Sequence, residues 1–262
     1  MAQPSLCQLE RPGCQALKYI LTEGSRRIGV TYCPGFGSGI LASKALHLEQ
    51  FVISRGNPFL RFDYTGNGDP SWPISFVQWK QDLFDSISQV AVGKQVLVGS
   101  SMGGWLSLLA AMEFPSKIAG LVLISPAPDF IAGFMKQMLA PELQEKLAQG
   151  DSIQIPGTTG ENITLNKSFL EGSLPFNLLN RESLPVKCPV RILHGMKDDL
   201  VPFLQSVKIA QALETVDVDV TFRKDGTHRL VEPSDLLLLT DTVDKLLTQL
   251  EKEDTTEGTH KL

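Results

Sequence analysis

The stretch LVGSSMGGW, residues 97–105, decides the fold class of this chain. It contains the pattern Gly-x-Ser-x-Gly centred on Ser101, with a second serine at Ser100. A β-rich run, KQVLV, precedes the pattern, and an Ala- and Leu-rich run follows it. A strand, a sharp turn and a helix in this order form a nucleophile elbow, which exposes a serine hydroxyl above a sheet. Because three fixed letters also occur in ordinary strand–helix turns, the rest of the chain has to support this interpretation.

The remaining sequence alternates short apolar runs with helical patterns. This rhythm predicts an α/β fold, a mostly parallel sheet with helices on both faces. The expected strands are 16–21, 27–33, 58–64, 94–100, 118–128, 189–195 and 218–224. The expected helices outside the insertion described next are 40–56, 76–90, 103–115, 204–214 and 234–253. The first two strands flank a Gly-Ser turn, which favours an entry hairpin.

One segment interrupts the rhythm. The 59 residues from Asp129 to Lys187 contain no strand that would extend the main sheet. Within them, helices are expected at 130–139 and 141–149, two short strands about a Gly-rich turn at 152–166, and a helix or loop at 168–179. So long a connection indicates a cap insertion across the carboxyl edge of the sheet. We therefore predict one domain, residues 1–253, with a cap at about 129–187, and a disordered polar tail at 254–262.

Composition excludes several classes of function. The 262 residues carry a net charge of −5 with no stripe of Lys and Arg, which argues against a nucleic-acid partner. No apolar run reaches the roughly 18 residues of a membrane span, so no stable membrane insertion is expected. The first 20 residues show neither a secretory nor an Arg-rich targeting pattern, which favours an intracellular location.

No metal or cofactor is expected either. The four cysteines lack CxxC pairing and have no histidine at zinc-ligand spacing. The loop DYTGNGDPS, residues 63–71, follows a strand as a phosphate-binding loop would. It lacks a third glycine and opens no helix, so dinucleotide binding is not expected.

A serine nucleophile needs a base and an acid, in the chain order Ser, acid, His. His260 lies in the polar tail, His47 lies in a helix, and His194 ends a strand before the candidate acids, as a structural histidine would. This leaves His228, on a Gly-containing turn after the last strand, as the expected base.

The acid is expected just after the strand that ends at His194. HGMKDDLVP offers Asp198 and Asp199, and Asp198 fits the pattern His-Gly-x-x-Asp-x-x-Val-Pro of many hydrolases. Asp199 would then point elsewhere, for example to cap the following helix. Ser101, Asp198 and His228, three separate signals in the expected order, predict a serine hydrolase.

Two further groups of residues complete the predicted site. Backbone N–H groups of Met102, at a helix N-terminus, and of Phe36, in the loop CPGFGSG, are expected to form the oxyanion hole. Phe130, Phe134 and Met138 fall on one face of the first cap helix and would line an acyl pocket if that face covers Ser101. The alternative, that this stripe only seals the cap to the core, stays open.

Over residues 16–250 the sequence resembles the α/β-hydrolase superfamily. More narrowly, RFDYTGNGDPS, QVLVGSSMGGWL, RILHGMKDDLVP and VDVTFRKDGTHRL resemble the family of α/β-hydrolase domain-containing protein 10. That resemblance implies a mitochondrial serine hydrolase linked to removal of S-palmitoyl groups and to hydrolysis of acyl glucuronides, with Ser101, Asp198 and His228 as its triad. The family has a mitochondrial presequence that is not visible here, and a genuine absence would imply the cytosol.

Three functions remain open from the sequence. The first is a thioesterase acting on acylated protein cysteines, and the second is a carboxylesterase acting on acyl glucuronides or small esters. The third is a catalytically silent binding protein with a hydrolase fold, against which the complete triad argues. The partner is then an acylated protein or a small acyl ester, and the sequence leaves the oligomeric state open.

Overall fold

The computed structural model describes residues 5–67, 69, 72–130, 139–156 and 162–259. Its centre is an eight-stranded sheet in the order β1-β2-β4-β3-β5-β6-β9-β10. The strands of this sheet are β1 (Cys7–Leu9), β2 (Leu17–Thr22), β3 (Ile28–Cys33), β4 (Phe59–Phe62), β5 (Lys94–Ser100), β6 (Ile118–Ile124), β9 (Val190–Gly195) and β10 (Val218–Arg223). All pairs from β4 to β10 are parallel, whereas β2 is antiparallel to both β1 and β4. The predicted α/β class is confirmed.

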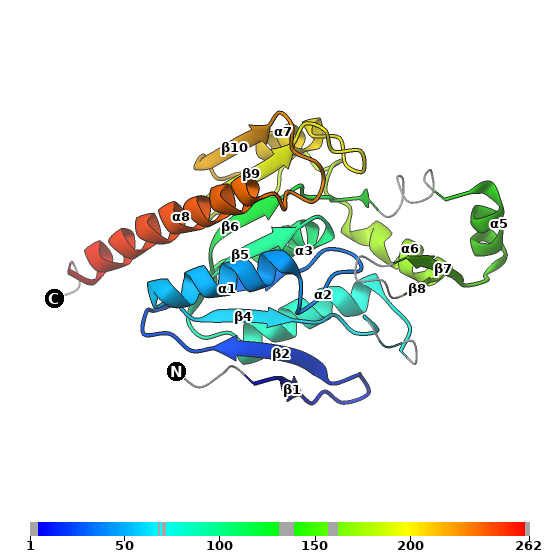
Figure 1. Cartoon of the computed structure of the whole chain (residues 1–262), viewed down its shortest axis with the longest axis horizontal. Helices are drawn as coiled ribbons and strands as arrows, with labels where there is room; N and C mark the ends of the chain where they lie inside the picture. The colour runs from blue at the N-terminus through cyan, green and yellow to red at the C-terminus, as the bar shows by residue number, and fades with distance from the viewer. Residues whose placement is uncertain (1–4, 68, 70–71, 131–138, 157–161, 260–262) are drawn as a thin grey trace.

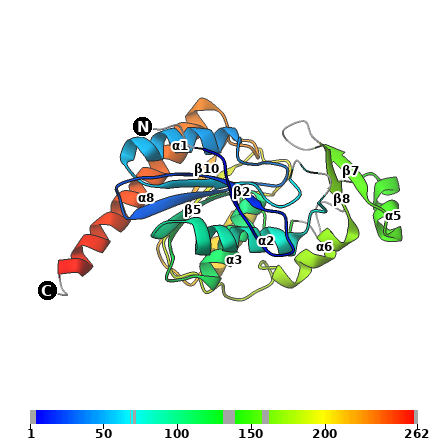
Figure 2. The same ribbon diagram turned by 90° about the horizontal axis from the view of Figure 1, so that it is seen from below.

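Helices cover both faces of the sheet (Figures 1 and 2). They are α1 (Ser43–Arg55), α2 (Phe76–Asp85) with a π-helical continuation η1 (Ser86–Val90), α3 (Met102–Glu113), α7 (Leu204–Ala212) and α8 (Pro233–Thr259). Side chains of α1 and α8 form one hydrophobic core with the sheet, and those of α2, α3 and α7 form the other. The central strands β3 and β4 are buried at every position, as expected for parallel strands covered on both faces.

Local signals in the sequence explain several element ends. The side chain of Ser75 accepts a hydrogen bond from the Gln78 N–H at the start of α2, as an N-cap does. Helix α1 ends at Gly56, whose φ of 87° is a left-handed conformation that glycine adopts at low cost. The period that predicted this helix and its end at Gly56 is confirmed.

The entry hairpin predicted for β2 and β3 is wrong. Strand β4 lies between them and pairs with both. A Cβ on Gly24 would lie 2.4 Å from the backbone carbon of Asn57, so the turn packs against the chain that enters β4. Two backbone bonds, Arg26 N–H to Gly56 and Val30 N–H to Pro58, fix this arrangement. A Gly-Ser turn sets a reversal of the chain but does not select the pairing partner.

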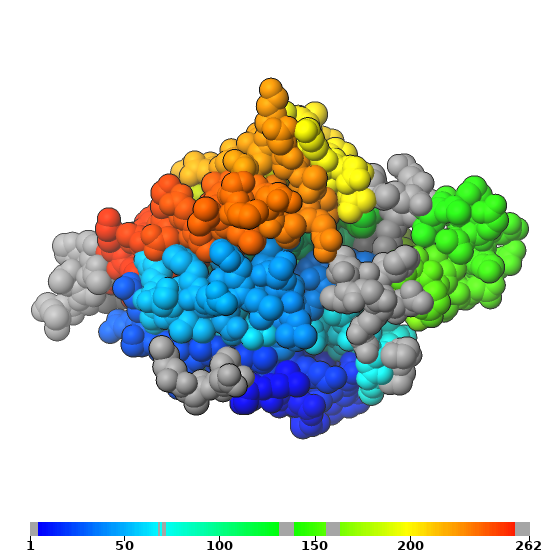
Figure 3. Space-filling view, viewed as in Figure 1, coloured from blue at the N-terminus to red at the C-terminus, as the bar shows by residue number. Residues whose placement is uncertain are grey.

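The cap insertion follows β6 and contains α5 (Pro141–Gln149), β7 (Ile153–Pro156), β8 (Asn162–Leu165), α6 (Lys167–Ser173) and the 3-10 turn η2 (Leu174–Phe176). Strands β7 and β8 form a separate antiparallel pair, as predicted. The elements α5, β7 and β8 project from one end of the molecule, whereas α6 lies next to α2 (Figures 1 to 3). The predicted first cap helix falls mainly on residues 131–138, which lie outside the described residues.

A single carboxylate ties the two ends of the cap together. Asp129, with a φ of 61°, accepts hydrogen bonds from the N–H groups of Leu178 at 2.7 Å and Leu179 at 2.9 Å. The indole N–H of Trp105 donates to the carbonyl of Phe176 at 2.9 Å and links this end of the cap to α3. The cap therefore leaves and re-enters the body at one place.

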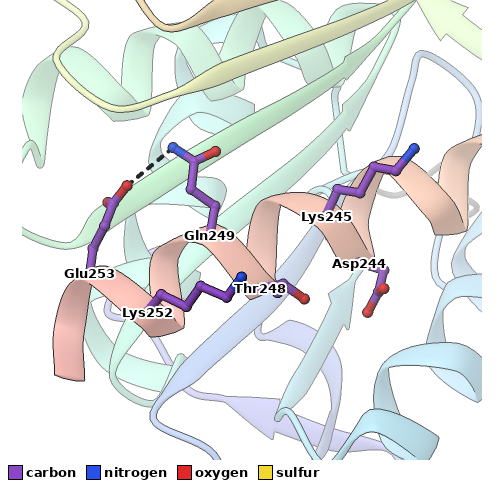
Figure 4. A pocket seen from close by; sticks show the side chains of 6 residues that line it. All are labelled: Asp244, Lys245, Thr248, Gln249, Lys252 and Glu253. Atoms are coloured by element: carbon purple, nitrogen blue, oxygen red, sulfur yellow. Dashed lines mark hydrogen bonds between the residues drawn. The ribbon is translucent and has the colours of Figure 1, made fainter. Parts of the chain in front are cut away.

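The disordered tail predicted for residues 254–262 is wrong for residues 254–259, which continue α8, and residues 260–262 lie outside the described residues. Nothing in the sequence from Glu253 to Glu257 breaks a helix, since the first glycine there is Gly258. The shallow hollow on α8 in Figure 4, lined by Asp244, Lys245, Thr248, Gln249, Lys252 and Glu253, lies near the amino edge of the sheet. Ser101 follows the carboxyl end of β5 at the opposite edge.

Candidate active site

Ser101 occupies the one-residue turn between β5 and α3. Its backbone has a φ of 54° and a ψ of −117°, which is a strained conformation for a residue with a side chain. Neighbouring backbone groups hold the turn, because the Ser101 N–H donates to Ile124 at 2.8 Å and the Ala127 N–H donates to Ser101 at 3.1 Å. The predicted elbow is therefore present at Ser101.

The glycines of the pattern allow the close packing that the elbow needs. A Cβ on Gly99 would lie 2.6 Å from the carbonyl oxygen of Gly103, and a Cβ on Gly103 would lie 2.1 Å from that of Cys33. Both neighbours are backbone atoms and cannot move aside as a flexible side chain could. The fixed letters of Gly-x-Ser-x-Gly thus follow from steric contact between α3, β5 and β3.

Replacing Gly103 by alanine should consequently destabilise the fold. We expect the free energy of unfolding to fall by at least about 2 kcal/mol, the scale of an overpacked interior site. Gly172 in α6 is the matched control, because a Cβ there meets only Val77 Cγ2 at an ordinary 3.6 Å. Urea unfolding of Gly103→Ala and Gly172→Ala measures both, and equal stabilities would contradict the packing argument.

The three predicted triad residues form one hydrogen-bonded chain. His228 Nε2 lies 3.0 Å from Ser101 Oγ, and His228 Nδ1 lies 2.8 Å from Asp198 Oδ2. Asp198 follows β9 and His228 follows β10, so both reach the same edge of the sheet as Ser101. Because a carboxylate only accepts, Nδ1 carries the proton and Nε2 is free to accept the serine proton. This tautomer is the one a general base requires.

Asp198 is held in place from four directions. Its Oδ1 accepts the N–H groups of Leu200 at 2.9 Å and Val201 at 2.8 Å, and its Oδ2 accepts from His228 and from His194 Nε2 at 3.0 Å. Burial disfavours the charge, but hydrogen bonds from His194 and His228 outweigh it and keep the pKa of Asp198 well below its usual value. The carboxylate is thus ionised throughout the neutral pH range.

His194 is the residue whose contact with the site the sequence did not reveal. It is fully buried, and its Nδ1 lies 2.7 Å from Ser206 Oγ. Since Nε2–H donates to Asp198, Nδ1 accepts from the Ser206 hydroxyl. The structural role predicted for His194 agrees with these bonds, but its partner is the candidate acid itself. The spacing of four residues between His194 and Asp198 was the available signal.

The sequence also offered another serine, another aspartate and further histidines as candidates for the site. Ser100 is buried at the end of β5, one residue before the elbow. Asp199 is exposed, and the suggestion that it caps the next helix is wrong, because α7 begins at Leu204 after the N-cap residue Phe203 and has no side-chain cap. His47 is half-buried in α1, and His260 lies outside the described residues.

The loop after β3 packs against Ser101. A Cβ on Gly35 would lie 3.3 Å from Ser101 Cβ, and the Ser38 N–H donates to the Gly35 carbonyl at 3.1 Å. Phe36 stands in this turn, and its ring packs between Trp79 and Phe169, with centroids at 5.6 and 5.7 Å. Met102 is the first residue of α3, so its N–H is one of the unpaired donors at a helix start. These positions suit the two predicted oxyanion donors.

The predicted acyl pocket stays a prediction. Phe130 is half-buried and packs against the larger hydrophobic core. Phe134 and Met138 lie outside the described residues. Within the described ranges, no three His, Cys, Asp or Glu side chains gather as metal ligands would. No helix among those same residues is both long and apolar enough to cross a bilayer.

Comparison with known proteins was made for the whole chain. Residues 32–238 match a model described as the alpha/beta hydrolase family. The human and rat proteins named palmitoyl-protein thioesterase ABHD10, mitochondrial, are 37% and 36% identical, over 94% of this chain and 81% and 84% of theirs. The solved structure of alpha/beta hydrolase domain-containing protein 10 from mouse aligns with a TM-score of 0.82 at 35% identity, covering 94% of this chain and 99% of that one.

Proposed function

The chain belongs to the α/β hydrolase family, and from that premise we propose that it cleaves acyl thioesters or esters through an acyl intermediate on Ser101. The observation that carries the proposal is the chain of hydrogen bonds from Ser101 through His228 to Asp198. A serine hydroxyl becomes a nucleophile when a positioned base takes its proton, and the contact between His228 Nε2 and Ser101 Oγ supports that role for His228.

The reaction proceeds in two halves. Ser101 Oγ attacks the acyl carbon while His228 Nε2 takes its proton, and the carbonyl oxygen becomes an oxyanion held by the N–H groups of Phe36 and Met102. The bond to the leaving thiol or alcohol then breaks, and the imidazolium returns its proton to that group. Water, deprotonated by His228, attacks the acyl–serine ester and releases the acid and the free serine.

Asp198 serves both halves without changing its charge. It holds the His228 ring with Nδ1 protonated and stabilises the imidazolium that forms twice in each cycle. The hydrogen bonds from His194, Leu200 and Val201 keep its pKa low, so the proton stays on His228. Each oxyanion donor is expected to lower the barrier by about 2.7–4 kcal/mol.

The substrate class we favour is an S-palmitoylated protein. Support comes from the relatives named palmitoyl-protein thioesterase and from the apolar stripe of Phe130, Phe134 and Met138 in the sequence. The same relatives support a mitochondrial location. The second candidate is a carboxylesterase acting on acyl glucuronides or small esters, because the triad chemistry is the same for both.

One set of measurements separates the three functions. A fluorophosphonate probe should label the wild-type protein, and failure to label would favour the silent binding protein. The value of kcat/KM for a palmitoyl-thioester peptide, set against that for an acyl glucuronide, then decides between thioesterase and carboxylesterase. A higher value for the glucuronide would refute our preference and leave the serine mechanism intact.

Acyl-chain length tests the proposed pocket. Each buried CH₂ contributes roughly 0.8 kcal/mol, so kcat/KM should rise several-fold per CH₂ until the pocket is full. Replacing both Phe134 and Met138 by alanine should flatten this rise and leave short p-nitrophenyl esters little affected. The measurement is kcat/KM for esters with acyl chains of about two to sixteen carbons, made on the wild type and on the double variant. A uniform loss at every length would show that these residues only hold the cap in place.

A further inference from the structure

One motif of the sequence has no role in the proposed reaction. RFDYTGNG begins at Arg61 near the end of β4 and continues into the turn after it. Strand β4 pairs with β3, so this turn is next to the loop after β3, which carries Phe36. Three polar side chains of the motif reach across to that loop.

All three bind backbone atoms within a stretch of three residues. Asp63 Oδ1 accepts the Ile40 N–H at 2.6 Å, and Arg61 Nη1 donates to the Ile40 carbonyl at 2.8 Å. Asn67 Nδ2 donates to the Ser38 carbonyl at 3.0 Å. Both the donor and the acceptor of Ile40 are thus satisfied by side chains of the neighbouring strand and turn.

Gly39 lets the loop approach this closely. A Cβ there would lie 2.2 Å from Asp63 Oδ1 and 2.9 Å from Asn67 Nδ2. A larger residue would push the loop off both side chains. The glycine of the loop and the polar residues of the motif therefore fit each other sterically as well as by hydrogen bonds.

The side chains that hold the loop are themselves fixed. Arg61 is buried and forms an ion pair with Glu49 of α1 at 2.8 Å, and Glu49 also accepts from the Thr22 hydroxyl. On the side of the turn away from the loop, Gln15 accepts the Gly66 N–H at 2.9 Å and donates to Asp69 at 2.8 Å. Gln15 thus binds the same turn without a hydrogen bond to the loop.

Ser38 and Ile40, which the motif binds, lie in the same loop as Phe36, the proposed oxyanion donor. The Ser38 N–H bonds to the Gly35 carbonyl and closes a turn that contains Phe36, and Gly35 contacts Ser101. We propose that Arg61, Asp63 and Asn67 are positioning residues that fix the loop 35–40, and with it the Phe36 N–H, for the oxyanion. This inference rests on the proposed function, because it requires an oxyanion at Ser101.

Asn67→Leu tests the proposal, with Gln15→Leu as the matched control at the same turn. We expect kcat of Asn67→Leu to fall about ten- to hundredfold, because a donor displaced by a fraction of an ångström loses much of its effect. KM should change by less than about twofold, since the bond to the oxyanion forms only in the transition state. Gln15→Leu should keep both constants near the wild-type values.

A trifluoromethyl ketone provides a second readout. It forms a tetrahedral adduct with the serine whose oxygen occupies the oxyanion position, so its inhibition constant should rise in step with the fall in kcat/KM of Asn67→Leu. Thermal unfolding confirms that both variants are folded, and Asn67→Ala replaces Asn67→Leu if the latter is not. Equal losses in the Gln15 variant, or a raised KM with an unchanged ketone constant, would overturn the proposal.

Assays of the wild-type protein distinguish a failure of the proposed function from a failure of the role assigned to the motif. If the wild type neither reacts with a fluorophosphonate nor hydrolyses any thioester or ester, the proposed function is wrong and no oxyanion loop exists. If it is active and Asn67→Leu is equally active, the proposed function stands and the role of the motif is wrong.

Discussion

Replacing Ser101 by alanine is expected to reduce kcat by about 10⁶-fold, the scale seen when a serine nucleophile is removed from a complete triad. The variant has no hydroxyl at the elbow, so no acyl intermediate forms and the fluorophosphonate probe has nothing to label. Stability should change little, because alanine takes the serine's backbone conformation at similar cost. Hydrolysis of a p-nitrophenyl ester and gel-based probe labelling measure the effect.

Ser100→Ala is the control for this prediction. Ser100 is buried at the end of β5, before the turn that holds Ser101, so removing its hydroxyl should leave most of the activity. An active Ser101→Ala protein together with an inactive Ser100→Ala protein would contradict the assignment of the elbow. Loss of labelling in both would point to a disturbed β5 rather than to chemistry.

Asp198→Asn is expected to lower kcat by up to about 10⁴-fold. In the native site both carboxylate oxygens accept, one from His228 and His194 and the other from Leu200 and Val201. An asparagine amide faces N–H donors with its own N–H groups in either orientation. If His228 avoids this clash by moving its proton to Nε2, it can no longer accept the proton of Ser101.

Asp199→Asn is the matched control and should lose little activity, because Asp199 is exposed. Equal losses in the two variants would show that the pair acts jointly or that the acid is wrongly assigned. The stability of the two proteins should also differ in its dependence on pH, which provides an independent test of the carboxylate.

The sign of that dependence follows from the lowered pKa of Asp198. A carboxylate with a lower pKa in the folded state stabilises the fold above its unfolded pKa of about 3.9 and loses this contribution as the pH falls through the folded value. The difference in unfolding free energy between the wild type and Asp198→Asn should therefore shrink as the pH is lowered below about 4. A difference independent of pH would contradict an ionised Asp198.

Features encoded in short stretches could be predicted from the sequence. The elbow at Ser101, the helix that ends at Gly56 and the pair β7–β8 each depend on residues close together in the chain. The hydrogen-bonded chain of Ser101, His228 and Asp198 could be predicted because each residue follows the end of a strand, and parallel strands bring such ends to one edge.

Pairing between distant segments could not be predicted. The insertion of β4 between β2 and β3 depends on the backbone at Asn57 packing against Gly24, which no local pattern records. The second imidazole on Asp198 was missed for a related reason, because His194 faces inward from β9 and only the turn after it brings Asp198 back to the ring. Polar contacts between the ends of neighbouring strands, such as that of Asn67 with Ser38, can be predicted only once the order of strands in the sheet is known.

The junction at Asp129 has a consequence for how such an enzyme can diversify. The Asp129 carboxylate joins the two ends of the cap insertion, because it accepts hydrogen bonds from the N–H groups of Leu178 and Leu179. Helix α6 of the cap packs beside α2. For a flexible insertion, doubling the number of residues between two fixed ends costs only about 0.6 kcal/mol of loop-closure entropy. Paralogues could therefore lengthen, shorten or exchange the outlying α5–β7–β8 portion and acquire new specificities while inheriting the triad unaltered. Grafts made between Leu139 and Leu165 would be the natural units of such recombination.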